Sequence, residues 1–265
     1  MQLNENLREN IGEAAELILK AKYVVALTGA GMSVESGIPD FRGPKGLWTK
    51  HGEPPMDGYQ RFLQNPKRDW GKRIKKEGYL AEVYENLGKA KPNLGHYALA
   101  ELDNLGILKC LITQNVDNLD RTAGVRNIAQ IHGDFTLLRC IECGSRYQEE
   151  EIEVSLDELP PHCPKCGGII KTDGVMFGEP IPPDVLRKCQ IETENCDCML
   201  VAGTSAVVYP AAGFPRYVKS KGGAIIEVNL TESGLTNYCD VSLQGKAGEI
   251  LPELVNRIKV KMHES

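Results

Sequence analysis

The sequence lacks several features that define other classes of protein. No apolar run approaches the length of a membrane-spanning helix, so no membrane is expected among the partners. The 31 Lys and Arg residues are outnumbered by 36 Asp and Glu residues, so no large basic field is available and no direct nucleic-acid partner is expected. Residues 1–10 lack the apolar core of a secretory signal, which predicts a cytoplasmic protein. At a net charge of −5, a cationic peptide is the better-matched partner.

The composition is that of a folded globular chain, with 42% hydrophobic and 25% charged residues. The length of 265 residues suits one large domain, or one domain with a small insert. Helical periodicity alternates with apolar runs, which predicts an α/β fold with a Rossmann-like, doubly wound and mostly parallel sheet. The predicted strands lie at residues 23–28, 108–113, 128–132, 198–203 and 224–229, with a short one near Val241. Ligands of such sheets bind beyond the carboxyl ends of the strands.

A glycine motif follows the first predicted strand. Gly29 is expected to permit a tight turn, and Gly31 to let backbone approach a ligand closely. The next residues are expected to open a helix whose free N–H groups attract a phosphate. A full dinucleotide fingerprint would have glycine at position 34, where this chain has Val34. Pro39 should stop the helix after about two turns, which leaves residues 40–42 as a loop carrying an acid, an aromatic ring and an arginine.

Nine cysteines without a secretion signal indicate a reducing compartment, with metal ligands or buried thiols rather than disulfides. Four of them form two Cys-x-x-Cys pairs separated by 19 residues, 144–162, which is the spacing of a four-cysteine zinc site. A complete set of four thiolates leaves no open coordination position, so this zinc is predicted to be structural. The ligands are Cys140, Cys143, Cys163 and Cys166, with His162 as a weaker alternative.

Polar residues follow several of the other predicted strands. Residues 114–118 carry amides and a carboxylate that could bind ribose hydroxyls, or could simply be turn formers. His132 stands beside Gly133, where an imidazole could act as a general base or be a satisfied structural residue. Residues 203–205 and Asn229 offer small hydroxyl and amide groups that suit an adenosine ribose, although a helix cap explains the hydroxyls equally well.

Taken together, these motifs resemble the sirtuin family of NAD-dependent protein deacylases. The resemblance covers roughly residues 10–255 and rests on residues 29–33 with 37–42, 113–117, 132–133, the four cysteines, 175–179, 203–205 and Asn229. It implies a Rossmann-type NAD-binding domain formed by residues 1–45, 93–134 and 173–265. It also implies a small domain formed by a helical insert, residues 46–92, and a four-cysteine zinc module, residues 135–172.

The resemblance also implies functional roles for individual residues. The NAD contacts would come from Gly29, Ala30, Gly31, Ser33, Val34, Asp40, Phe41, Arg42, Gln114, Asn115, Val116, Asp117, Gly203, Thr204, Ser205, Asn229 and Ala247. His132, Asn115 and Asp117 would be catalytic. The acyl-lysine protein or peptide would contact His132, Val175, Phe177 and Gly178, pairing with residues 175–178 as an added strand.

The family's chemistry consumes NAD and does not use it as a hydride carrier. As the resemblance implies, the acyl oxygen attacks C1′ of the nicotinamide ribose as nicotinamide leaves. His132 then acts as a general base on a ribose hydroxyl and promotes its attack on the imidate carbon. Water finally releases free lysine and O-acyl-ADP-ribose; for an acetyl-lysine substrate, this product is O-acetyl-ADP-ribose.

One departure from the family pattern predicts the acyl preference. Members that prefer succinyl or malonyl groups carry a Tyr-x-x-Arg pair in the helical insert. The comparable stretch here is Trp70-Gly71-Lys72-Arg73, without the tyrosine, so acetyl or a longer apolar acyl group is favoured. Two other functions remain as alternatives: a mono-ADP-ribosyltransferase that uses the same NAD cleft, and a non-catalytic NAD sensor.

Overall fold

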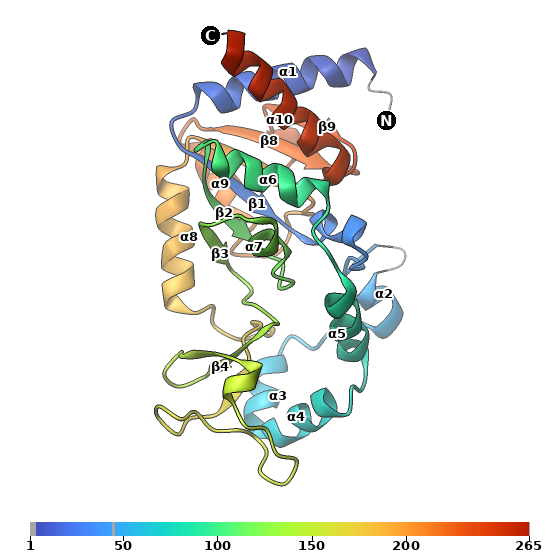
Figure 1. Ribbon diagram of the computed structural model, residues 1–265, viewed down its shortest axis with the longest axis vertical. Coiled ribbons are helices and arrows are strands. Elements are labelled where there is room, and N and C mark those ends of the chain that lie inside the picture. Colours follow the sequence, from blue (N-terminus) through green and yellow to red (C-terminus); the bar gives the residue numbers. More distant parts are fainter. Residues whose placement is uncertain (1–3, 44–45, 265) are drawn as a thin grey trace.

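A six-stranded parallel sheet forms the centre of the larger part of the molecule (Figure 1). The structure is a computed structural model that describes residues 4–43 and 46–264. The strands lie in the order β3-β2-β1-β7-β8-β9, and every neighbouring pair is parallel. Their bounds are β1 Val24–Thr28, β2 Leu108–Thr113, β3 Ile128–Gln130, β7 Cys198–Ala202, β8 Ala224–Asn229 and β9 Val241–Gln244.

Helices cover both faces of this sheet and bury its alternate residues. Val24 and Ala26 belong to the core beneath α1 (Glu5–Lys20), α6 (Leu94–Asn104) and α10 (Ala247–Glu264). Val25 and Leu27 belong to the opposite core, beneath α8 (Pro183–Asn195) and α9 (Gly213–Ser220). A strand buried on both faces reads as a continuous apolar run, which is why the sequence marks these strands so clearly. The predicted α/β fold with a doubly wound parallel sheet is confirmed.

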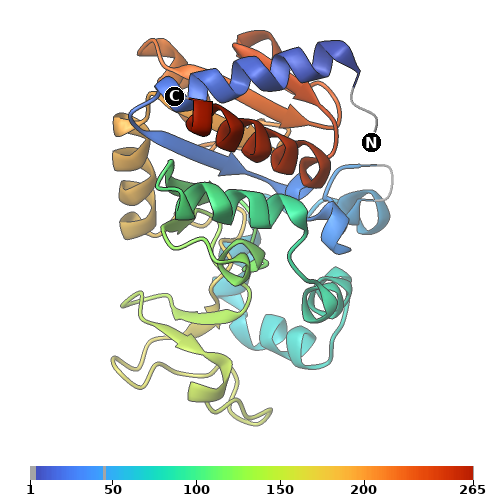
Figure 2. The same ribbon diagram turned by 45° about the horizontal axis from the view of Figure 1, so that its top comes forward.

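A smaller domain lies beside one end of the sheet (Figures 1 and 2). It combines the antiparallel strands β4 (Leu137–Cys140), β5 (Arg146–Gln148) and β6 (Ile170–Thr172) with four helices of the insert. Phe62 and Trp70 of the insert share one core with Leu138, Cys140 and Ile170. The two segments therefore pack as one unit, although far apart in sequence. The insert helices are α2 (Leu47–His51), α3 (Gly58–Gln64), α4 (Pro66–Ile74) and α5 (Tyr79–Lys89).

Shorter elements complete the fold. They are α7 (Leu119–Ala123) and the 3₁₀ turns η1 (Ala30–Met32), η2 (Val34–Ser36), η3 (Glu149–Glu151) and η4 (Thr236–Tyr238). The domain boundary predicted after residue 45 lies outside the described residues. None of the helices described in residues 4–43 and 46–264 combines the length and the apolar character that crossing a membrane requires.

The strand order changes direction between β1 and β7, and this switch point is where parallel sheets bind ligands. Here the loops that follow β1 and β7 touch backbone to backbone. Gly31 N donates to Gly203 O at 2.8 Å. Gly203 has a left-handed φ of +62°, and a Cβ on it would lie 2.3 Å from Met32 N. Only glycine fits at this position, so the contact fixes the two loops against each other.

The glycine motif differs from the sequence expectation in two ways. Gly29 is extended, with φ −140° and ψ −169°, so no tight turn requires it. A Cβ there would instead lie 2.8 Å from Thr204 Cβ, so contact with a neighbouring loop excludes a larger residue. The predicted helix is also replaced by the two short 3₁₀ turns η1 and η2. They end at Gly37, whose left-handed φ of 88° terminates the helical backbone before Pro39 is reached.

Candidate functional site

The loops after β1 and β2 are joined by a chain of buried hydrogen bonds. Asn115 Nδ2 donates to the Gly29 carbonyl at 3.0 Å and to Ser33 Oγ at 3.1 Å. Ser33 Oγ in turn donates to Asp117 Oδ2 at 2.6 Å. Burial raises the pKa of the Asp117 carboxyl, while the Ser33 hydrogen bond opposes that rise. The structure therefore brings together Gly29, Ser33, Asn115 and Asp117, which come from two separate motifs.

His132 lies just beyond β3, beside the same loop. Its Nδ1 is 3.1 Å from the Gln114 carbonyl oxygen. A carbonyl can only accept, so Nδ1 carries the proton and Nε2 keeps a free lone pair. Burial lowers the pKa of His132 below its usual 6.5, although the Gln114 hydrogen bond acts in the opposite direction. The imidazole is therefore neutral near pH 7, in the tautomer that a general base at Nε2 requires.

Residues 203–205 and Asn229, the predicted adenosine contacts, are connected to loop 114–117 through Thr204. Gln114 Nε2 donates to Thr204 Oγ1 at 2.9 Å, and Asn229 Nδ2 donates to the Thr204 carbonyl at 3.0 Å. Thr204 Oγ1 also accepts from Ala206 N at 3.2 Å, within a turn that precedes α9 by several residues. Thr204 is thus not the helix cap that the sequence allowed. Its neighbour Ser205 is exposed beyond the strand end.

Loop 40–42 contacts the insert rather than the hydrogen-bonded centre. The Phe41 ring centroid lies 5.1 Å from that of Trp48, and the Arg42 guanidinium lies 4.6 Å from the Trp48 ring. Trp48 also lies 5.7 Å from Phe177, so one ring connects the predicted cofactor loop with the predicted substrate segment. From the sequence, Trp48 is predicted only to belong to the helical insert, residues 46–92. The only sign in the sequence is that Trp48 is an aromatic residue a few positions after loop 40–42. Its position does not show which residues it packs against.

Further contacts place several of the other predicted residues. Val175 N donates to the His132 carbonyl at 2.8 Å, so the predicted substrate segment begins beside the imidazole. Ala247 is buried at the start of α10, where Glu35 Oε2 accepts from Gly248 N at 2.8 Å. Glu35 thereby holds that helix N-terminus against the loop after β1, a role that its sequence position did not suggest. Val34 is exposed, and Val116 O accepts from Phe135 N at 2.9 Å.

The four predicted metal ligands form a compact cluster. Their sulfur atoms all lie within 4.8 Å of one another. Cys140 Sγ is 3.6 Å from Cys166 Sγ, and Cys143 Sγ is 3.8 Å from Cys163 Sγ. A tetrahedron with zinc–sulfur bonds of about 2.3 Å has sulfur–sulfur edges of about 3.8 Å, so the set fits structural zinc. His162, the weaker alternative, lies outside this group, and its Nδ1 is 2.9 Å from the Gly167 carbonyl oxygen.

Comparison with known proteins identifies the family. The model of the Sir2 family matches residues 29–210, more than half of the chain. This chain belongs to the Sir2 family. The NAD-dependent protein deacylase 1 of Archaeoglobus fulgidus is 46% identical over 244 residues, which cover 91% of this chain and 95% of that protein. The resemblance drawn from the separate motifs is therefore confirmed.

Solved Sir2 structures match over nearly the whole chain. A Sir2 homologue in complex with ADP-ribose gives a TM-score of 0.79 at 43% identity and covers 99% of both chains. A Sir2 structure with a deacetylated p53 peptide and 3′-O-acetyl-ADP-ribose gives a TM-score of 0.78 at 32% identity, covering 93% of this chain and 97% of that one. The Sir2 fold thus extends over both the sheet domain and the smaller domain of this chain.

A second buried histidine of this Sir2 chain predicts how its stability depends on pH. His96 is fully buried in the first turn of α6, and burial lowers its pKa to about 4. Because the unfolded chain binds a proton near pH 6.5, stability should fall as the pH drops from about 6.5 towards 4, with roughly 3 kcal/mol lost from this group. Denaturant unfolding of wild type and His96→Gln across this range measures the difference. Parallel pH profiles of the two proteins would contradict the prediction.

Proposed function

We propose that this chain is an NAD-dependent protein-lysine deacylase that releases nicotinamide and O-acyl-ADP-ribose. The observation that carries the proposal is a neutral His132 that is bonded through Nδ1 to the Gln114 carbonyl, and through its own carbonyl to Val175 N of segment 175–178. Membership of the Sir2 family, whose named relatives are NAD-dependent protein deacylases and deacetylases, supports the same reaction. A bound NAD supplies the electrophilic C1′ of its nicotinamide ribose and is consumed.

The residues around His132 would have different roles in binding NAD and in catalysis. Ser33, Asn115 and Asp117 would surround the nicotinamide ribose, since their hydrogen bonds already hold them in one cluster. The predicted phosphate contacts follow β1, and the predicted adenosine contacts follow β7 and β8 at the same edge of the sheet. His132 would take a proton from a ribose hydroxyl at Nε2, while Gln114 keeps Nδ1 protonated. These are the roles that we propose for the residues when NAD is bound.

Segment 175–178 offers backbone groups for an incoming peptide. In the part of the chain that the structure describes, the Val175 carbonyl and the Gly178 amide have no hydrogen-bond partner. The segment is not extended throughout, because Glu179 N donates to the Met176 carbonyl at 3.0 Å and Gly178 has a left-handed φ of +79°. An incoming peptide could bond to both free groups through its main chain, but not along one continuous extended edge. The Phe177 backbone is bonded to the helical insert, because its carbonyl accepts from Tyr59 N of α3 at 3.0 Å. An acyl-lysine peptide therefore suits this edge.

A cytoplasmic location stays a prediction from the sequence.

Incubation of the protein with NAD and an acetyl-lysine peptide tests the proposal. Nicotinamide release should require the acyl group, and the deacylated peptide should form in equal amount. ADP-ribose attached to a protein, with the peptide still acylated, would favour the mono-ADP-ribosyltransferase. NAD binding without any nicotinamide release would favour the sensor. The free Nε2 of His132 argues against that last alternative, because a sensor needs no base.

The acyl preference is expected to favour acetyl over succinyl by at least about tenfold in kcat/KM, since an acidic acyl group lacks a charged hydrogen-bond partner. Trp70 stands where the Tyr-x-x-Arg pattern has its tyrosine and is buried, with Nε1 donating to the Ile170 carbonyl at 2.8 Å. Arg73 is paired with Glu149 at 3.1 Å. Parallel assays with acetyl- and succinyl-lysine versions of one peptide measure the ratio. Equal or faster desuccinylation would show that another cation binds the acid.

A further inference from the structure

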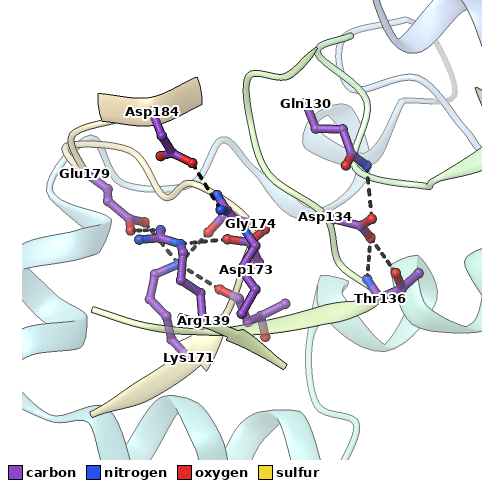
Figure 3. A network of polar contacts seen from close by, with 11 residues as sticks. Gln130, Asp134, Thr136, Arg139, Lys171, Asp173, Gly174, Glu179 and Asp184 are labelled. Carbon is purple, nitrogen blue, oxygen red and sulfur yellow. Dashed lines mark hydrogen bonds and ion pairs between the residues drawn. The ribbon is translucent and has the colours of Figure 1, made fainter. Parts of the chain in front are cut away.

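A buried network of charges lies where the smaller domain meets segment 175–178 (Figure 3). It contains three cations and three carboxylates, and four of the six side chains are almost fully buried. These four are Arg139, Lys171, Asp173 and Glu179, while Arg146 and Asp184 form the more exposed end. Charged residues are seldom buried in this number without a reason. The network contains none of the residues predicted to bind NAD.

Its two central carboxylates bracket segment 175–178. Arg139 contacts both of them, with Nε 2.6 Å from Asp173 Oδ1 and Nη2 2.5 Å from Glu179 Oε1. Asp173 is also paired with Arg146 Nε at 3.0 Å. One guanidinium therefore fixes the distance between the two ends of the segment. The guanidinium is planar and holds its N–H donors in a rigid arrangement, so the directions in which it binds the two carboxylates are fixed as well.

The same network binds the backbone inside the bracket. Glu179 Oε2 accepts from Met176 N at 2.8 Å and lies 3.1 Å from Lys171 Nζ. Lys171 Nζ also donates to Gly174 O at 2.5 Å and to Thr172 O at 2.8 Å. All three ammonium protons thus have acceptors, and two of these acceptors belong to the run from Gly174 to Glu179. The side chains therefore bind backbone groups of a run that belongs to no helix or strand and has only a turn, from Glu179 N to the Met176 carbonyl at 3.0 Å, of its own.

This run is also pressed against the candidate base. Val175 N donates to the His132 carbonyl at 2.8 Å. Next to it, Gly133 has φ +81°, and a Cβ there would lie 2.2 Å from the Asp173 carbonyl oxygen. A shift of the bracketed segment would therefore move the peptide-binding edge relative to the imidazole.

We propose that Glu179 and Lys171 are positioning residues for the acyl-lysine peptide: they hold the free Val175 carbonyl and Gly178 amide in register with His132. The inference rests on the proposed function, because an acyl-lysine peptide binds segment 175–178 only if the chain is a deacylase. Arg139 precedes the zinc ligand Cys140 on β4, so the zinc module reaches the peptide edge through this arginine. NAD binding does not depend on the network.

The variant Glu179→Gln tests the proposal with a matched control. The amide keeps the shape of the side chain but cannot accept from Met176, Lys171 and Arg139 together. Glu227→Gln is the control, because Glu227 is an equally buried carboxylate on β8 that accepts from Thr236 Oγ1 at 2.6 Å and from Ser242 Oγ at 3.3 Å. We expect Glu179→Gln to raise the peptide KM about tenfold or more, as expected for a lost charge-assisted hydrogen bond. NAD affinity without peptide should stay within about twofold.

A loss of stability alone would give a different result. Both variants should lower the melting temperature, whereas only Glu179→Gln should change the peptide KM. An unchanged peptide KM in folded Glu179→Gln, or an equal rise in Glu227→Gln, would overturn the proposal. If the wild type itself fails to deacylate any acyl-lysine peptide, the proposed function fails instead.

Hydrogen exchange on the wild type gives a second test that needs no variant. The Met176 amide should be protected without peptide, because Glu179 already occupies it. Exchange of that amide at the rate of an open loop would overturn the proposal even if Glu179→Gln does not fold.

Discussion

Replacing His132 with alanine is expected to slow acyl transfer by about 10²–10⁴-fold, the usual contribution of a general base. The reason is the geometry of the imidazole, whose Nδ1 is committed to the Gln114 carbonyl and whose Nε2 is free. NAD affinity should fall much less, because its predicted contacts come from the loops after β1, β7 and β8. Single-turnover deacylation and NAD binding, measured on the same preparation, check both expectations.

Nicotinamide exchange separates this role from a general loss of the site. Exchange needs only the first step, so it should survive in His132→Ala better than product formation does. Asn115→Ala and Asp117→Ala should instead impair nicotinamide cleavage itself, because these residues are bonded to Ser33 at the predicted ribose site. His263→Ala, at an exposed position near the end of α10, is the control and should behave as wild type. An unfolded His132→Ala, or a folded one with near wild-type deacylation, would remove His132 from the base role.

Loss of one zinc ligand is expected to unfold the smaller domain. Cys143 is exposed, so Cys143→Ser removes a thiolate without opening a cavity in the core. Structural zinc contributes on the order of 10–16 kcal/mol of apparent binding energy in small modules. Cys140 and Cys163 belong to the same core as Phe62 and Trp70, so release of the metal should loosen the helical insert as well. Zinc content, thermal unfolding and activity should all decrease together.

Cys239→Ser is the control for this experiment. Cys239 is a partly buried thiol outside the cluster, with Sγ 3.3 Å from the Leu235 carbonyl oxygen. That variant should keep its zinc and its smaller domain. Correctly folded wild-type protein that contains no zinc would contradict the assignment of the four cysteines.

The strands and the four-cysteine cluster could be predicted from the sequence, because each is marked by a pattern of nearby residues. Buried strands read as apolar runs, and the paired cysteines carry their spacing in the chain itself. The polar strand ends were also found, because parallel strands bring their carboxyl ends to one edge. What the sequence could not show was which loops touch. The reasons for Gly29 and Gly31 were therefore assigned to a turn and to a ligand, whereas both glycines contact the loop after β7.

Contacts between distant segments account for the remaining omissions. The buried pairing of Lys171 and Glu179 was not predicted, since a single charged residue in the sequence gives no sign that its partners lie far along the chain. Their burial follows from the meeting of β4, β6 and the segment after β6. Trp48 and Glu35 were missed for the same reason, because their partners belong to other elements.

The fate of the acyl oxygen tests the central claim most directly. An acetyl-lysine peptide carrying ¹⁸O in its acetyl carbonyl is incubated with NAD and the wild-type protein, and the products are analysed by mass spectrometry. The account predicts that this oxygen bonds to C1′ as nicotinamide leaves, so the label stays on the ribose of O-acetyl-ADP-ribose. Label recovered in free acetate, with no acetylated ADP-ribose formed, would contradict it.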